Sequence, residues 1–191
     1  QSDHYPPPSQ NNGQNGGQGR LFEHAGLKYF ELNTADDPSG LQTWFQGAAT
    51  GVGDQGSNWE MVSAGGAWVA HPENAAFNAG FIRDQGALLV VFVLTDEYDN
   101  SPEDASVYHD MLAGTKAGCG GDLCIVAGGL MPPCIESTPG NVLGQFVNSF
   151  GEPGIIGDIG SPANTSHYPN VLGDTLAQVI AQTCEVIPPV G

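Results

Sequence analysis

Three carboxylates follow directly after a short apolar run of the sequence. They are Asp96, Glu97 and Asp99, and the run is ALLVVFVL at residues 87–94. Short continuous runs of β-branched and other apolar residues are typical of strands buried on both faces, as in parallel sheets. Ligands of open parallel sheets bind outside the carboxyl ends of the strands, where we expect these side chains to lie. Neighbouring carboxylates repel one another, and Mg²⁺ or Ca²⁺, which prefer oxygen ligands, would relieve the repulsion. The segment is a candidate cation site; the alternative is a solvated acidic turn that caps the following helix.

A second candidate junction is GDQGSN at residues 53–58, which precedes a predicted helix over 57–70. Ser57 and Glu60 have the spacing of a capping box, in which each side chain binds a backbone N–H of the first helical turn. The hydroxyl of Ser57 could cap this helix, bind an ion, or do both in turn. Spacing alone favours capping.

These residues need a framework, and the chain supplies alternating strand and helix patterns. Strands are predicted over 27–33, 87–94 and 123–130, and helices over 57–70, 101–114, 141–150 and 172–184. This order predicts an α/β fold with a parallel sheet. Residues 1–20, rich in Pro, Gln, Asn and Gly, are predicted to be an extended tail or loop. Residues 21–191 are predicted to form one domain.

The charge balance excludes several partners. The 191 residues include 21 acidic and 4 basic side chains, for a net charge of −17. Binding to nucleic acid requires clustered Lys and Arg, which this chain lacks. An anionic membrane surface is disfavoured for the same reason. The longest apolar run has eight residues, far fewer than the roughly 20 that span a bilayer, so no membrane insertion is expected.

The four cysteines favour an oxidising compartment. They lack a zinc-type spacing, and four cysteines allow three disulfide pairings. The preferred pairing joins Cys119 to Cys124, across the turn CGGDLC, and Cys134 to Cys184, which would tie a loop to the last helix. This pairing implies secretion or exposure at the cell surface. The alternative is four buried free thiols.

Motifs of the common enzyme classes are absent from the sequence. It contains no GxSxG elbow, HExxH pair, Walker loop or GxGxxG fingerprint. An aspartate-based hydrolase centred on Asp96 would need a second acid or base, which the sequence does not assign. A non-catalytic role is therefore expected.

One segment resembles a known family. NAGFIRDQGALLVVFVLTDEYDNS at 78–101 resembles the central segment of secreted bacterial von Willebrand factor type A domains, in which such a strand ends in T-D-E-D-D or a close variant. GDQGSNWEMVSAGGAWV, which begins at Gly53, resembles the Gly-Gly-Thr/Ser junction and following helix of that family. The resemblance implies a doubly wound, mostly parallel α/β fold, similar to a Rossmann fold, with a metal-ion-dependent adhesion site. It implies that Asp96 is the third-loop aspartate and that Ser57 replaces the second-loop threonine.

The chain departs from the family pattern in one respect. The first-loop motif D-x-S-x-S is missing, and the nearest string, DIGSP at 158–162, has another spacing and follows another element. We therefore expect a sheet without its first, central strand, which an N-terminal segment or another chain would supply. The ion site is expected to be incomplete within these residues.

The leading functional hypothesis is an extracellular or cell-surface adhesion domain that binds a protein or another macromolecule through Mg²⁺ or Ca²⁺. Asp96 would hold the ion directly or through water, Ser57 would add a hydroxyl, and Glu97 and Asp99 would add charge or outer support. The alternative is a subunit that assembles with copies of itself into a surface layer or filament, for example by strand addition. A hydrolase ranks third.

Overall fold

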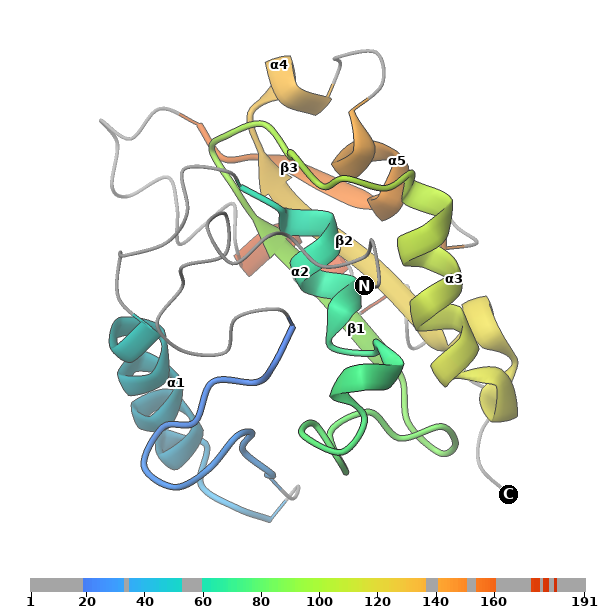
Figure 1. Ribbon diagram of the computed structural model, residues 1–191. Coiled ribbons are helices and arrows are strands. Elements are labelled where there is room, and N and C mark those ends of the chain that lie inside the picture. Colours follow the sequence, from blue (N-terminus) through green and yellow to red (C-terminus); the bar gives the residue numbers. More distant parts are fainter. Residues whose placement is uncertain are drawn as a thin grey trace.

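A parallel three-stranded sheet forms the centre of the protein (Figure 1). The computed structural model describes residues 19–32, 35–52, 60–136, 141–150 and 154–160, together with 173–175, 177, 178 and 181. The strands are β1 (Leu89–Leu94), β2 (Ile125–Met131) and β3 (Ile155–Asp158), side by side in the order β1-β2-β3. Both pairs of strands are parallel, which confirms the predicted α/β class with a parallel sheet.

The two long strands arise from the two apolar runs of the sequence. Their register pairs Leu89 with Ile125 and Leu94 with Leu130. The side chains of Val91 and Val93 are buried on one face of β1. Strand β3 was not predicted, because its four residues, IIGD, are too few to show a periodic pattern.

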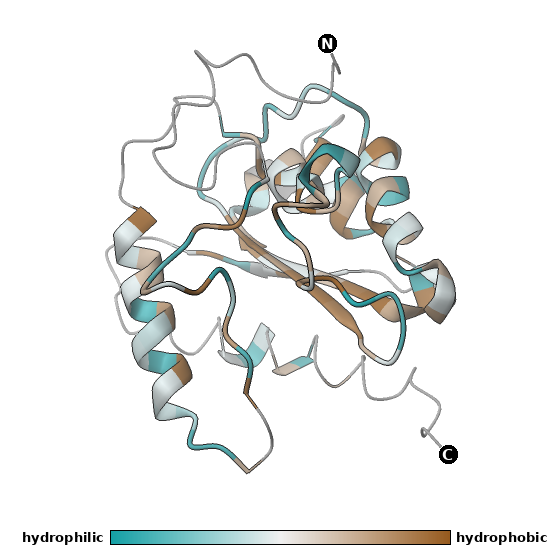
Figure 2. Cartoon of the chain, turned by 60° about the horizontal axis from the view of Figure 1, so that its bottom comes forward, coloured by the Kyte–Doolittle hydropathy of each residue, from teal (hydrophilic) through white to brown (hydrophobic). Residues whose placement is uncertain are grey.

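Three helices cover one face of the sheet. They are α2 (Val62–Trp68), α3 (Ala105–Thr115) and α5 (Val142–Val147). Their apolar sides meet the strands in a single buried cluster, in which Tyr108 and Phe146 pack edge to face with ring centroids 6.4 Å apart. Figure 2 shows the hydrophobic residues gathered in the strands and in the helices beside them. Burial of these side chains is the main favourable contribution to folding.

The predicted helices are present, but their boundaries differ from the prediction. Helix α3 begins at Ala105 rather than next to Ser101. Helix α5 begins after Asn141, whose side chain accepts a hydrogen bond from the N–H of Leu143. The short helix α4 (Pro133–Glu136) joins β2 to this region. The described residues of the predicted last helix, 173–175, 177, 178 and 181, are helical.

Among the described residues, the other face and the outer edge of the sheet are less covered than the face that carries α2, α3 and α5. In Figure 1 the described residues of 173–181 are drawn behind the sheet, whereas α2 lies in front of it. Among the described residues, β1 pairs with β2 alone and therefore forms an edge of the sheet. Val90 is 39% exposed and Leu94 is 54% exposed on this strand.

An additional helix, α1 (Ser39–Val52), was not predicted from the sequence. It packs through Trp44, whose indole N–H donates to the carbonyl of His24 over 3.0 Å. Gly47 permits this close approach, because a Cβ at that position would collide with the imidazole of His24. The predicted strand over 27–33 is wrong for 27–32, the residues that the structure describes there. Leu27 forms only an isolated bridge with His24, since the aromatic side chains that follow pack against different elements.

The turn CGGDLC is closed by a disulfide between Cys119 and Cys124, which confirms the first predicted pairing. These cysteines lie in two short 3₁₀ helices, η2 (Ala117–Cys119) and η3 (Gly121–Cys124). Cys134 is exposed, and Cys184 lies outside the described residues. The pairing of Cys134 with Cys184 therefore stays a prediction.

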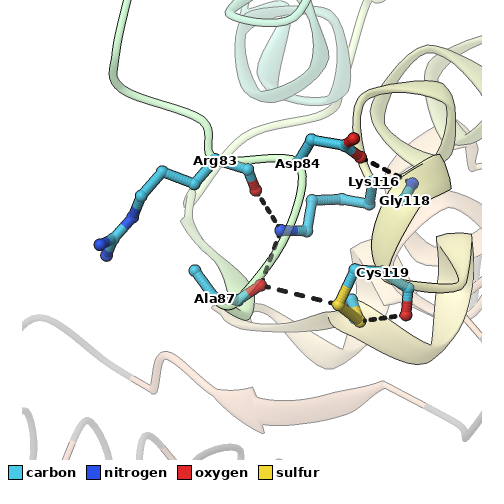
Figure 3. Close-up of a disulfide and its surroundings, with 7 residues drawn as sticks. Arg83, Asp84, Ala87, Lys116, Gly118 and Cys119 are labelled. Carbon is cyan, nitrogen blue, oxygen red and sulfur yellow. Dashed lines mark hydrogen bonds between the residues drawn. A yellow bond between two sulfur atoms is a disulfide. The ribbon is translucent and has the colours of Figure 1, made fainter.

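The disulfide turn is fastened to the loop that leads into β1 (Figure 3). Lys116, only 1% exposed, donates from Nζ to the carbonyl oxygens of Arg83 and, over 2.6 Å, of Ala87. The N–H of Gly118 donates to the carboxylate of Asp84 over 2.7 Å. Burial lowers the pKa of Lys116, while Asp84 opposes the shift. Hydrogen bonds to carbonyl oxygens satisfy a cation that would otherwise be costly to bury.

None of the helices in the described ranges has both the length and the apolar character needed to cross a membrane.

Candidate functional site

The acidic segment begins where β1 ends, as predicted. The N–H of Thr95 donates to the carbonyl of Leu130 over 3.1 Å, which extends the pairing of β1 with β2 by one residue. The hydroxyl of Thr95 then accepts from the N–H of Glu97 over 3.1 Å and turns the chain away from the sheet. Asp96 and Glu97 are exposed in this turn. The parallel sheet therefore presents both carboxylates at its carboxyl edge.

Asp99 has a different role from its neighbours. Its carboxylate accepts hydrogen bonds from the backbone N–H of Val62 over 3.0 Å and of Ser63 over 3.3 Å. It also accepts from the hydroxyls of Ser63 and Ser101. A carboxylate placed at the first turn of a helix satisfies N–H groups that have no partner within the helix. Asp99 thus caps α2 from a distant part of the chain. Its hydrogen bonds favour this capping role over the predicted support of a cation.

Ser101 completes the same cap. Its Oγ accepts from the N–H of Ala64 over 2.9 Å and donates to Asp99 over 2.6 Å. Ser101 does not cap the helix that follows it, because its side chain is turned toward α2. Three successive N–H groups of α2, those of residues 62, 63 and 64, are therefore satisfied by the loop after β1.

Glu60 joins the acidic edge, although the sequence suggested only a capping role for it. Helix α2 begins at Val62. Its N-cap residue is Met61, whose side chain makes no capping hydrogen bond. The carbonyl of Glu60 accepts from the N–H of Asn100 over 2.6 Å, which brings the acidic loop beside it. Burial raises the pKa of Glu60, and the charges of Glu97 and Asp96 raise it further. These three carboxylates therefore share one region of negative potential.

The other predicted ligands are not assembled by the described residues. Ser57 lies outside them. The carboxylate of Asp96 has no hydrogen-bond partner among the residues that the structure describes. Within the same part of the chain, no three side chains of His, Cys, Asp or Glu are grouped so that they could hold a metal ion. A complete ligand set would therefore need groups from elsewhere.

The basic side chains all lie near one segment, 77–87. Arg20 and Lys28 both approach the ring of Phe77, with the Arg20 guanidinium carbon 5.6 Å and the Lys28 Nζ 3.7 Å from its centroid. Arg83 belongs to the segment itself, and Lys116 donates to its carbonyl oxygens. This segment precedes β1, whereas the acidic loop follows β1. Opposite ends of one strand therefore carry the bases and the acidic edge.

A second titratable cluster lies on α3. The imidazole of His109 is held between two carboxylates, with Nδ1 2.9 Å from Asp110 and Nε2 3.0 Å from Asp122. Its ring stacks near Phe150, with centroids 5.0 Å apart. Burial alone would lower the pKa of His109, but the two carboxylates outweigh burial and raise it. His109 thus ties α3 to the disulfide turn, because Asp122 belongs to that turn.

Comparison with known proteins found no relative. No family model, curated protein or solved structure matches the chain. The resemblance to type A domains therefore stays a prediction from the sequence.

Proposed function

We propose that the chain is a non-catalytic, extracellular binding domain of the von Willebrand factor type A kind, doubly wound, that engages its partner at the carboxyl edge of the sheet. The observation that carries this proposal is the position of Asp96 and Glu97, exposed where β1 ends, in a loop that the hydrogen bond from Asn100 to the carbonyl of Glu60 holds beside Glu60. The raised pKa of Glu60, caused by burial and by the charges of Glu97 and Asp96, agrees with this placement. Negative potential without a compensating base at such an edge favours a cation. The Cys119–Cys124 disulfide is compatible with an extracellular location.

In this proposal a divalent cation is shared between the domain and its partner. Asp96, exposed at the end of β1, binds Mg²⁺ or Ca²⁺ directly or through water, and Glu97 and Glu60 contribute charge. Ser57 adds a hydroxyl, and a carboxylate from the partner completes the coordination. Asp99 is left to cap α2, because its oxygens already accept hydrogen bonds from that helix.

Titration calorimetry with Mg²⁺ and Ca²⁺ tests the proposal on the intact chain. We expect one site whose affinity falls at least tenfold in Asp96→Asn. Asp174→Asn, which removes an exposed carboxylate on another element, is the matched control and should bind as the wild type does. Absence of heat for both ions would contradict the proposal, as would equal affinity in Asp96→Asn and wild type.

A second candidate function is self-assembly through β1. Its support is the position of β1 at an edge of the sheet, with Val90 and Leu94 exposed on it. Exposed edge strands accept further strands, and charged residues on them oppose such pairing. Sedimentation analysis should then show oligomers that Leu94→Lys converts to monomers. A wild-type chain that stays monomeric at all concentrations would eliminate this candidate.

A further inference from the structure

A groove lies on the segment that precedes α1 in the sequence. Its volume is about 560 Å³, and it is lined by Glu23 and by residues 26–31. This segment turns sharply where His24 and Leu27 form two backbone hydrogen bonds with each other, of 2.9 and 3.0 Å. Gly26 makes this turn with a φ of +79°, a conformation that residues with a Cβ rarely adopt. The groove thus follows from the local fold of one segment.

The walls of the groove are fixed by contacts with two other elements. The ring of Tyr29 packs against Phe81 with centroids 5.8 Å apart, and that of Phe30 packs against Trp44 of α1 at 5.9 Å. The ammonium of Lys28 donates to the carbonyl of Phe77 over 2.7 Å. These contacts hold the lining side chains before any ligand arrives, which reduces the entropic cost of binding.

The chemistry of the lining suits a neutral polar ligand. Glu23 and Glu31 are exposed, and neither has a hydrogen-bond or ion-pair partner in the part of the chain that the structure describes. Each offers two acceptor oxygens, while the ammonium and the phenol of the groove offer donors. Lys28 offsets one of the two carboxylates in the lining, although the whole chain carries −17. The groove therefore combines donors, acceptors and aromatic rings without a strong net charge.

We infer that this groove binds a neutral oligosaccharide. Sugar hydroxyls both donate and accept hydrogen bonds, so Glu23, Lys28 and Glu31 can each find a partner among them. The apolar C–H faces of a sugar ring can pack on the rings of Tyr29 and Phe30. The volume lies within the usual range of ligand pockets, roughly 300–1,000 Å³, and its open form admits a chain of sugar units. A basic peptide is the competing ligand class, because Glu23 and Glu31 would attract it while Lys28 would repel it.

The inference is independent of the proposed cation-dependent binding, so its test is performed with EDTA present. Calorimetry on the full chain would use two neutral probes, cellohexaose and the fully N-acetylated chitohexaose. We expect at least one to bind, and we expect Glu23→Ala/Glu31→Ala to weaken that binding at least tenfold. Asp104→Ala/Asp174→Ala removes the same number of exposed carboxylates outside the groove and should leave the affinity unchanged.

Ionic strength separates the two ligand classes. Binding of a neutral sugar should be unchanged when salt is raised, whereas binding of a basic peptide should weaken as its charges are screened. Circular dichroism would confirm that the double variant is folded, as expected for exposed positions. The inference is overturned if neither hexasaccharide binds, if the double variant binds as tightly as the wild type, or if only an arginine-rich peptide binds, in a salt-dependent manner.

Discussion

The carboxylate of Asp99 lies 3.0 Å from the backbone nitrogen of Val62, although 37 residues separate them in the sequence. This hydrogen bond joins the loop that leaves the sheet to the beginning of the helix that covers it. Ser101 extends the junction to Ala64. The start of α2 is thus set by residues of another element, and the two substructures are expected to be stable only together.

Replacing Asp99 should destabilise the fold. Asp99→Ala leaves three backbone N–H groups and two hydroxyls without their acceptor, and we expect the free energy of unfolding to fall by about 2 to 3 kcal/mol. Urea denaturation would measure the change. Asp96→Ala is the control, because Asp96 is exposed and should change stability by less than about 0.5 kcal/mol. Equal losses in the two variants would contradict the assignment of Asp99 as the cap.

Removing the charge of Glu60 should stabilise the protein at neutral pH. Because its pKa is raised above the ordinary 4.5, the folded state binds this proton more tightly than the unfolded state, and stability falls as pH rises from 4.5 through the folded pKa. Glu60→Gln should therefore unfold at higher urea than wild type at pH 7. The difference should vanish at about pH 3, where both states are protonated. Glu97→Gln should reduce the effect, since Glu97 supplies part of the repulsion.

The cluster around His109 should make stability depend on pH in the same direction but in a higher pH range. The raised pKa means that the protonated imidazole contributes stability that is fully present below the unfolded value of about 6.5 and is lost as pH rises through the folded pKa. His109→Gln should therefore lose most stability, relative to wild type, on the acid side of neutrality. Proton NMR of the imidazole would give the pKa directly, and Asp122→Asn should lower it. A pKa at or below 6.5 in the wild type would refute this prediction.

Loss of the disulfide should weaken the fold moderately. Cys119 and Cys124 are five residues apart. Closing so short a loop lowers the conformational entropy of the unfolded chain and thereby raises the free energy of unfolding by about 2 kcal/mol. Cys119→Ser/Cys124→Ser should reduce the free energy of unfolding by that amount, and a reducing agent should have the same effect on the wild type. The reducing agent should then leave the double variant unchanged. A full-sized further loss in the variant would indicate another disulfide, such as Cys134–Cys184.

Strands β1 and β2 could be predicted because each is a short apolar run whose burial needs no knowledge of its neighbours. The Cys119–Cys124 bond was predictable for the same reason, since short spacing limits the partners. Helix α1 escaped prediction because its glycines lower helical propensity, and its support comes from Trp44 packing on residues far away in sequence. The capping role of Asp99 was equally hidden, because only the folded chain brings it to α2. The run of carboxylates that suggested charge or outer support for a cation at Asp99 could not show where its hydrogen bonds go.

The bases and the acidic edge are separated, so charge is distributed unevenly along β1. All four cations lie near the segment that enters β1, and Glu60, Asp96 and Glu97 lie where β1 ends. These seven charges contribute a dipole along the strand. Near a positively charged surface the acidic edge would face that surface, and the groove would face the solvent. Contact with a partner at the acidic edge would then leave the groove accessible.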